Sequence, residues 1–386
     1  MYVRNNVWVR SLNWIVLFAL IGSMSTPGNA KADQLDVWIG TGGPPSKGIY
    51  HCVLDSGSGR LSESRLVAEM GSPGFLAMHP SRPVLYAVGS LNGEGVVASF
   101  DIQGTGMEAT LTQTSVHSIG DGGATHLSVS RDGCTLLTAQ YGGGSVAAFL
   151  LDEGGSITAR TALIKHVGGS NIVSGRQTAP HAHWIGFSPD QRYSFVPDLG
   201  LDQVVIYQVD SKRATLQPHG VGQLPAGAGP RHQKFHPNGK WIYVLNELAL
   251  SVSLFDWQPE VGTMQIRQTV PTVDQHELDR LRQKSCSEIR IHPNGRFVYA
   301  ANRGHDSITV FSIGEHGELT SIQNEPVRGA TPRNFNLDPS GSWLLAAGQD
   351  SHTLASFIVD SETGMITYSA NVISTPCPIC ILFEHE

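Results

Sequence analysis

Residues 289–313 read IRIHPNGRFVYAANRGHDSITVFSI, and this stretch decides the fold. It holds three short runs rich in apolar residues, separated by the turn segments HPNG and NRGHD. Apolar residues that alternate with a period of two, between turns of Gly, Asn, Asp and Pro, are typical of antiparallel strands. The stretch therefore predicts a three-stranded meander.

The same pattern recurs along most of the chain. Five further copies begin at Leu76, Leu127, Ile185, Lys234 and Phe335. Their central turns lie 46 to 58 residues apart, which leaves room for a fourth strand in each unit. Four antiparallel strands repeated about every 50 residues describe one blade of a β-propeller.

Six copies and the opening segment from Asp36 predict an all-β fold, a seven-bladed β-propeller with four antiparallel strands per blade. The closing segment MITYSANVISTPCPICILFE, from Met365, can pair with the opening segment, which closes the ring and removes its sheet edges. Residues 33–386 are expected to form this single domain. A short turn of helix is expected near His276.

The composition excludes several classes of protein. The chain of 386 residues has 43 Gly and 21 Pro, only 15% charged residues, and 40% hydrophobic residues. That hydrophobic content and a net charge of only −7 exclude a disordered chain, and the low charge excludes a coiled coil. The negative balance also argues against a nucleic-acid partner.

The N-terminal residues have the pattern of an export signal. Arg4 and Arg10 precede or flank the apolar run LNWIVLFALIGSM, which starts at Leu12, and Ala30-Lys31-Ala32 resembles a cleavage site. We expect residues 1–32 to be a signal peptide, which places the mature protein in the periplasm. The apolar run is short for a membrane span, so no membrane association is expected after its removal.

The repeat also indicates where polar residues gather, because each inner strand returns through a tight turn to the second strand of its blade. On this pairing Arg231 lies opposite Asn246 and diagonal to Glu247, Glu288 lies beside Arg303, His183 faces Asp198 with His181 further out, and Arg333 faces Gly348. All these positions fall at the same end of their blades. A cluster of His, Arg and carboxylate side chains is therefore expected at one mouth of the central channel.

Several segments resemble one known family. The motifs RQTAPHAH from Arg176, GPRH from Gly229, NE from Asn246 and NRG from Asn302, in this order, are similar to those of the seven-bladed lactonases. That family includes propeller-type 6-phosphogluconolactonases, periplasmic gluconolactonases and carboxymuconate-lactonizing enzymes. The resemblance covers nearly the whole chain after the signal. The sequence departs from the family pattern at Gly348, where Asn is common, and at Cys286-Ser287, where two Ala are common.

The resemblance implies roles for individual residues. Four residues match the active-site positions of the lactonizing branch and are expected to be catalytic: His183, Arg231, Glu247 and Arg303. On chemical grounds Glu247 is a candidate general base, the two arginines can hold the oxyanion, and His183, oriented by Asp198, is a candidate proton donor. The expected substrate-binding residues are His181, Arg176, Asp198, Glu288, Arg333 and His232.

Export favours an unphosphorylated substrate, because a phosphorylated sugar lactone is a cytosolic metabolite. We therefore expect a secreted lactonase that hydrolyses glucono-1,5-lactone to gluconate. The alternatives are a 6-phosphogluconolactonase, a muconate-type lactonizing cycloisomerase and a non-catalytic propeller that serves as a binding scaffold. The expected partner is a small sugar lactone, and the protein is expected to be a monomer or a weak dimer.

No cofactor or metal is expected. The pair His181 and His183 would point to the same side of a strand, as zinc ligands can, but Arg231 and Arg303 nearby would repel a cation. The five Cys residues are too scattered for a disulfide framework, although Cys377 and Cys380 are close enough in sequence to pair.

Overall fold

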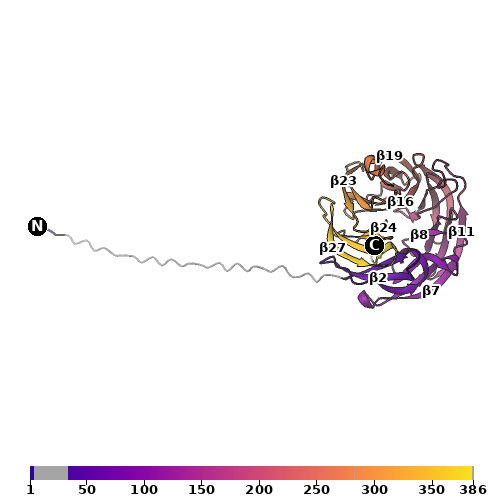
Figure 1. The fold of residues 1–386 in the computed structure, drawn as a ribbon, viewed down its shortest axis with the longest axis horizontal. Helices are drawn as coiled ribbons and strands as arrows, with labels where there is room; N and C mark the ends of the chain where they lie inside the picture. Colours follow the sequence, from indigo (N-terminus) through magenta and orange to yellow (C-terminus); the bar gives the residue numbers. More distant parts are fainter. Residues whose placement is uncertain (4–33, 282, 385–386) are drawn as a thin grey trace.

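The computed structural model describes residues 1–3, 34–281 and 283–384, and its strands form seven four-stranded antiparallel sheets (Figure 1). The sheets are arranged as blades around a central axis, which confirms the predicted seven-bladed β-propeller. The expected signal peptide, residues 1–32, lies outside the described residues except for its first three.

The blades are numbered 1 to 7 along the chain, and each contributes one strand to each of four concentric positions. The innermost strands, in blade order, are β28 (Pro378–Phe383), β4 (Gly71–Met78), β8 (Ala124–Val129), β12 (Gly186–Phe187), β16 (Pro230–Phe235), β20 (Ser285–Ile291) and β24 (Pro332–Leu337). The second strands are β1 (Gln34–Thr41), β5 (Val84–Leu91), β9 (Thr135–Gln140), β13 (Tyr193–Asp198), β17 (Trp241–Asn246), β21 (Phe297–Arg303) and β25 (Trp343–Gly348).

The outer half of each blade completes the sheet. The third strands are β2 (Gly48–Asp55), β6 (Glu94–Gln103), β10 (Ser145–Leu151), β14 (Gln203–Asp210), β18 (Ser251–Gln258), β22 (Ser307–Ile313) and β26 (Thr353–Val359). The outermost strands are β3 (Arg65–Glu69), β7 (Thr110–Ser118), β11 (Ile157–Lys165), β15 (Thr215–Gln223), β19 (Thr263–Pro271), β23 (Leu319–Pro326) and β27 (Ile366–Ser374), several of which are labelled at the rim in Figure 1.

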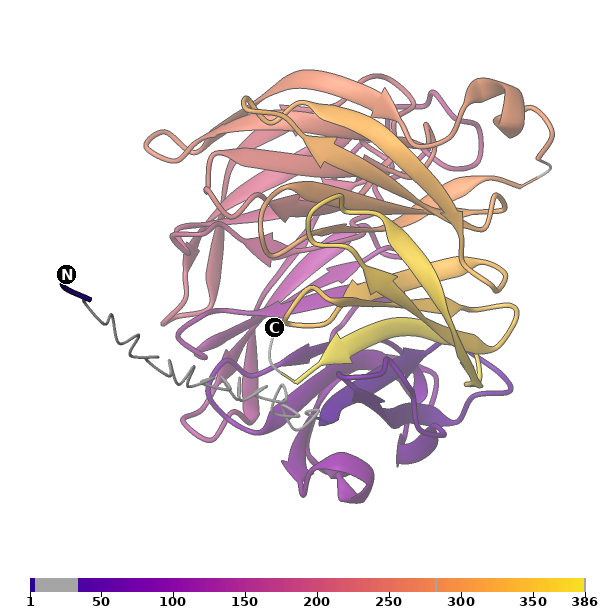
Figure 2. The ribbon, with the colours of Figure 1, turned by 90° about the vertical axis from the view of Figure 1, so that its left-hand side faces the viewer.

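Helical structure is limited to two short segments among the described residues. The 3-10 turn η1 spans Gly106–Glu108, and the helix α1 spans Gln275–Leu278, where the sequence predicted a short turn of helix. Helix α1 lies on the outside of the propeller (Figure 2). No described helix has the length and apolar character needed to cross a membrane.

The ring is closed by strands from the two ends of the described domain. β28 pairs with β1 in blade 1, where Val37 lies opposite Phe383 and Ile39 opposite Ile381. The innermost strand of blade 1 therefore comes from the closing segment of the sequence, as the repeat predicted. Without this pairing β1 would present an open edge at the centre of the ring.

All five Cys residues are free thiols, including Cys377 and Cys380.

The hydrophobic core lies between blades. The described residues form seven hydrophobic clusters, and each cluster combines side chains of two adjacent blades. Side chains alternate between the two faces of a strand, so each blade contributes one face to each neighbour. In the cluster between blades 6 and 7, for example, Tyr299 packs with Phe335 and Phe357, all of them fully buried.

A hydrogen bond from a tyrosine hydroxyl to a glycine carbonyl recurs at several interfaces between neighbouring blades. The hydroxyl groups of Tyr86, Tyr243 and Tyr299, on second strands, donate to the carbonyls of Gly155, Gly317 and Gly364, at 2.6, 2.8 and 2.9 Å. Each glycine lies in the turn before the outermost strand of the next blade and has a positive φ. A side chain at Gly364 would overlap the Phe297 ring. These turns are therefore tight because they pack against the neighbouring blade.

We expect Gly364→Ala to lower the free energy of unfolding by about 2–4 kcal/mol, because it combines an unfavourable φ of +74° with overpacking against Phe297. Gly93→Ala is the matched control, since Gly93 has a φ of +81° but nothing within 4 Å of an added Cβ. The control should lose only about 1–2 kcal/mol. Urea unfolding measures both, and equal losses would contradict the proposed packing role.

Candidate active site

The inner strands are irregular at the end where they begin. Their pairing with the second strands shifts register around Thr125, Arg231, Ser287-Glu288 and Arg333. A β-bulge adds a residue to one strand and changes the direction in which its side chains point. The bulges bring side chains from different blades, among them Thr125, Arg231 and Arg333, to one mouth of the channel.

These bulges make the pairings expected from regular hairpins wrong. Pro230, not Arg231, lies opposite Asn246. Ser285, not Glu288, lies opposite Arg303.

The same holds in two other blades. Pro332, not Arg333, pairs with Gly348. Ala182, not His183, forms the bridge with Asp198. The expected residues still lie at the same end of the blades, because each bulge shifts the pairing by only one residue.

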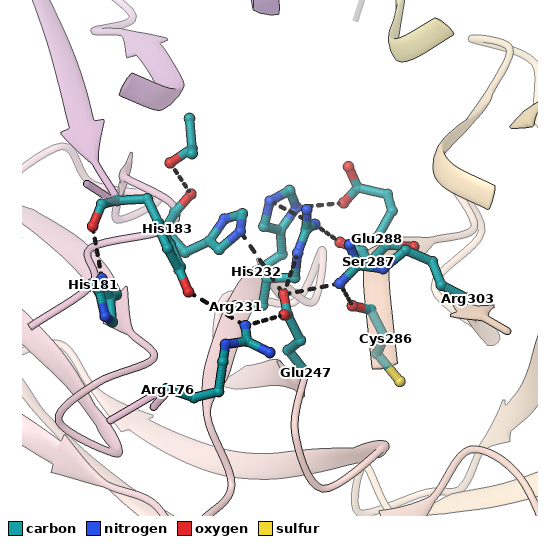
Figure 3. A network of polar contacts seen from close by, with 12 residues as sticks. Arg176, His181, His183, Arg231, His232, Glu247, Cys286, Ser287, Glu288 and Arg303 are labelled. Carbon is teal, nitrogen blue, oxygen red and sulfur yellow. Dashed lines mark hydrogen bonds and ion pairs between the residues drawn. The ribbon is translucent and has the colours of Figure 1, made fainter. Parts of the chain in front are cut away.

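Glu247 is the centre of the polar network at the mouth (Figure 3). It follows β17, and only 5% of the residue is exposed. Its Oε1 lies 2.7 Å from Nη2 of Arg176, and its Oε2 lies 2.9 Å from Nε of Arg231 and 3.1 Å from Nη2 of Arg303. One buried carboxylate thus holds three guanidinium groups from three parts of the chain.

The charges at the mouth do not balance. Burial raises the pKa of Glu247, but Arg303, Arg231 and Arg176 outweigh it and lower this pKa to about 2. Burial and the charge of Arg303 lower the pKa of Arg231 to about 9. Burial and Arg303 also lower the pKa of Arg333. Glu247 forms ion pairs with three of these arginines, Arg176, Arg231 and Arg303, and is outnumbered by them, so the mouth favours an anion or an oxygen atom that gains negative charge.

His183 lies beside this network. Its Nε2 is 3.9 Å from Oε2 of Glu247, and its Nδ1 is buried without a hydrogen-bond partner among the described residues. Burial, followed by the charges of Arg231 and His232, lowers the pKa of His183 well below 6.5. The imidazole is therefore neutral near pH 7 and offers a nitrogen to a bound molecule.

The expected partnership between His183 and Asp198 is wrong. Asp198 is fully buried, and its Oδ2 lies 2.6 Å from Nδ1 of His166. Its Oδ1 accepts hydrogen bonds from the backbone N–H groups of His181, Gly200 and Leu201. Asp198 therefore holds the loop around His181 in place and does not contact His183.

Glu288 is likewise a buried support. Its Oε1 lies 3.0 Å from Nδ1 of His232, and its Oε2 accepts a hydrogen bond of 2.5 Å from Nδ2 of Asn334. His232 in turn lies 3.2 Å from Nη1 of Arg231. Glu288 is 0% exposed, so it can orient His232 but cannot reach a substrate.

A small cavity at the mouth brings together four of the expected residues. It has a volume of about 160 Å³, and we call it the mouth chamber. Its polar wall consists of Thr125, His183, Arg231, His232 and Arg333 among others. Glu247 lies behind Arg231, and Arg303 and Arg176 contact Glu247 from its other sides. Glu247, Arg303 and Arg176 are not part of the cavity wall.

One residue of the network was not predicted as a site residue. Tyr141 accepts a hydrogen bond of 3.3 Å at its hydroxyl from Arg176, and its ring stacks on His181 with 4.3 Å between ring centres. Tyr141 follows β9 as Glu247 follows β17, so an alignment of the repeats would have pointed to it.

No group of three His, Cys, Asp or Glu side chains able to hold a metal ion is found within residues 34–281 and 283–384.

Comparisons with known proteins agree with this fold. Residues 36–383 match the family model described as "Lactonase, 7-bladed beta-propeller". The chain is 35% identical over 343 residues to the 6-phosphogluconolactonase of Bacillus subtilis, covering 88% of this chain and 95% of the relative. It is 33% identical over 333 residues to the 6-phosphogluconolactonase of Formosa agariphila, covering 83% and 91%. The structure of the Pseudomonas aeruginosa periplasmic gluconolactonase superposes with a TM-score of 0.83 at 26% identity, covering 91% and 99%.

Acid should destabilise the fold through its buried histidines. Burial holds the pKa values of His126, His183 and His232 below 6.5, that of His232 at about 4. Below pH 6.5 the unfolded chain therefore takes up protons that the folded chain does not, and stability is lost at up to about 1.4 kcal/mol per pH unit for each histidine.

Urea unfolding between pH 7.5 and pH 5 measures this loss. His126→Asn can still accept the hydrogen bond from the Ile185 N–H but does not titrate, so its stability should depend less on pH. The exposed His316→Asn is the control and should keep the pH dependence of the unmodified protein. An unchanged slope in His126→Asn would contradict the assignment.

Proposed function

The chain belongs to the lactonase family of seven-bladed β-propellers, and we propose that it hydrolyses a sugar δ-lactone, glucono-1,5-lactone, to gluconate. The observation that carries this proposal is the mouth chamber, where the neutral His183, with a nitrogen that has no partner among the described residues, faces the same small cavity as the buried Arg231 and the partly buried Arg333. Ester hydrolysis needs a group that takes a proton from water and cations that hold the oxyanion.

Arg231 and Arg333 are the proposed oxyanion donors. Both line the mouth chamber, and their charges exceed what Glu247 can neutralise. When water adds to the lactone carbonyl, the carbonyl oxygen becomes negatively charged. Arg231 is already held in place by Glu247, so it can stabilise this charge more strongly than bulk water does, because it needs no reorientation.

His183 is the proposed general base, in place of Glu247. A carboxylate with a pKa of about 2 that is bound by three guanidinium groups is a poor proton acceptor at neutral pH. The neutral His183 can take a proton from the attacking water. We assign Glu247 the role of a positioning residue that fixes Arg176, Arg231 and Arg303.

The proton taken up by His183 is used in the last step, in which the lactone ring opens. As the tetrahedral intermediate collapses, the bond between the carbonyl carbon and the ring oxygen breaks. His183, now protonated, gives its proton to the ring oxygen, which becomes a hydroxyl group of the product. The product is an aldonic acid that releases one proton to solution, so the net change is the addition of one water and the release of one acid equivalent.

Two sets of observations bear on the choice of substrate, and they favour different lactones. The expected signal peptide and the likeness to the periplasmic gluconolactonase favour glucono-1,5-lactone. The relatives named 6-phosphogluconolactonase and the excess of arginine at the mouth favour a phosphorylated lactone as the second candidate. We give export the greater weight, because it decides which metabolites the enzyme meets.

A pH-stat assay decides between the candidates. We expect glucono-1,5-lactone to be hydrolysed with a kcat/KM at least about tenfold above that for 6-phosphoglucono-1,5-lactone. The reverse ranking would establish the phosphorylated substrate. A muconolactone is the third substrate and tests for the cycloisomerase. Turnover of none of the three lactones would leave a non-catalytic scaffold as the explanation.

Substitutions test the proposed roles. His183→Asn should lower kcat by about 10²–10⁴ with little change in KM, because it removes the base. Glu247→Gln should lower kcat and raise KM together and reduce stability, because the arginines lose their common partner. The exposed His316→Asn is the control for activity. If Glu247→Gln kept full activity while its stability fell, the positioning role would be wrong.

A further inference from the structure

Asp202 is a buried carboxylate that does not belong to the wall of the mouth chamber. It lies immediately before β14 and is only 1% exposed. Its φ is +55°, a conformation that Asp and Asn adopt more readily than most other residues. The three groups that donate hydrogen bonds to its carboxylate are all uncharged N–H groups. Its function must therefore be sought in the segments that it binds.

The carboxylate of Asp202 joins two segments that are distant in the sequence. Its Oδ1 accepts hydrogen bonds of 2.7 Å from Nε2 of Gln177 and from the backbone N–H of Gly229. Its Oδ2 accepts a hydrogen bond of 2.7 Å from the backbone N–H of Gly227. Both oxygens are thus used, one of them for each segment and one for the second segment alone.

Each of these segments carries an arginine that binds Glu247 (Figure 3). Gln177 follows Arg176, whose Nη2 lies 2.7 Å from Oε1 of Glu247. Gly229 lies two residues before Arg231, whose Nε lies 2.9 Å from Oε2 of Glu247. The carbonyl of Gly229 also accepts a hydrogen bond of 2.7 Å from the N–H of Glu247. The contacts therefore form a closed loop that runs from one buried carboxylate, along both segments, to the other.

The two segments are also tightly packed where Asp202 binds them. Gly229 has a φ of +62°, and a Cβ added to it would lie 2.5 Å from Cγ of Leu248. Gln177 is 0% exposed, and its Nε2 also donates to the carbonyl of Leu199 at 2.8 Å. Close packing of this kind transmits small displacements from one group to the next. A change at Asp202 is therefore expected to move both segments.

A similar arrangement occurs in blade 6. Asp306 lies immediately before β22, as Asp202 lies before β14, and its φ is +53°. Its Oδ1 accepts a hydrogen bond of 2.9 Å from the N–H of Thr331. Thr331 lies two residues before Arg333, which lines the mouth chamber. In both blades an aspartate at this place thus holds the start of the next inner strand, two residues before an arginine of the mouth.

We propose that Asp202 is a positioning residue of the active site, which holds Arg176 and Arg231 where they bind Glu247. This inference deepens the proposed lactone hydrolysis and rests on it for its kinetic readout. Asp202 itself does not contact the substrate, because it is buried and outside the chamber wall. It acts through Arg231, a proposed oxyanion donor. A misplacement of about 1 Å at such a group can lower the rate by about 10²-fold.

Asp202→Asn is the test variant. Asn tolerates the positive φ, but it cannot replace both carboxylate oxygens, because its NH₂ group would face an N–H donor. Asp338→Asn is the matched control. Asp338 is 2% exposed, and its two oxygens also accept three hydrogen bonds, from the N–H of Trp343 and from the N–H and hydroxyl of Ser340. It follows β24 at the end of the blade away from the mouth.

Urea unfolding and lactone kinetics separate positioning from stability. Both variants should lower the midpoint of urea unfolding, since each leaves a buried donor unpaired. Only Asp202→Asn should also lower kcat/KM for glucono-1,5-lactone, by about 10–100-fold and mainly through kcat. Asp338→Asn should keep the kcat/KM of the unmodified protein. Equal kcat/KM in the two variants would overturn the proposal.

Hydrogen exchange of the backbone amides provides a readout that needs no substrate. The N–H groups of Gly227, Gly229 and Glu247 should exchange at least about tenfold faster in Asp202→Asn than in Asp338→Asn, because a lost hydrogen bond allows local opening. Equal exchange rates at these groups would overturn the proposal even if activity fell. If the unmodified protein hydrolysed no lactone, the proposed function would fail, whereas faster exchange here would still support the role of Asp202 in holding the two segments.

Discussion

The structure depends on packing between blades. Each of the seven hydrophobic clusters joins two adjacent blades, so a blade cannot bury both of its faces alone. The last interface is formed only when β28 pairs with β1. The clusters that join blade 1 to blades 2 and 7 are therefore complete only when the ring is closed, and the positions of the inner strands are fixed by their neighbours as well as by their own sheet. This constraint gives the channel side chains their precise positions.

The architecture was predictable from the sequence because the pattern of strands and turns of one blade recurs along the chain. The alternation in residues 289–313 and its recurrence at regular intervals determine four strands per blade and seven blades. The end of each blade where polar residues gather also follows from hairpin order. The pairing partners of Arg231 and Arg333 did not follow, because a β-bulge shifts the register by one residue and no residue type marks it here.

The chemistry of the site depends on burial that sequence does not reveal. Glu247 was expected to be the general base and His183 the proton donor; three guanidinium groups lower the pKa of Glu247 to about 2, and burial lowers the pKa of His183 well below 6.5. Both pKa shifts arise from tertiary packing, and Glu247 is bound by Arg303 of blade 6 as well as by Arg231 of its own blade. Asp198 shows the same point, since its partner His166 lies on the loop after β11 and is distant from it in the sequence. Residue types indicate the candidate site, and the tertiary contacts support the roles proposed for its residues.

The innermost strand of blade 1, β28, is the last strand to be made when the polypeptide is synthesised. Residue Ile379 lines the mouth chamber, and Cys380, Ile381 and Leu382 line a larger cavity of about 930 Å³. A growing chain therefore has every arginine of the mouth in place before either cavity has its full wall. During that time the inner edge of β1 is available to any strand of similar pattern, including β28 of another copy. A chain that ends before Pro378 lacks part of the wall of both cavities, so their walls are completed only by the last strand.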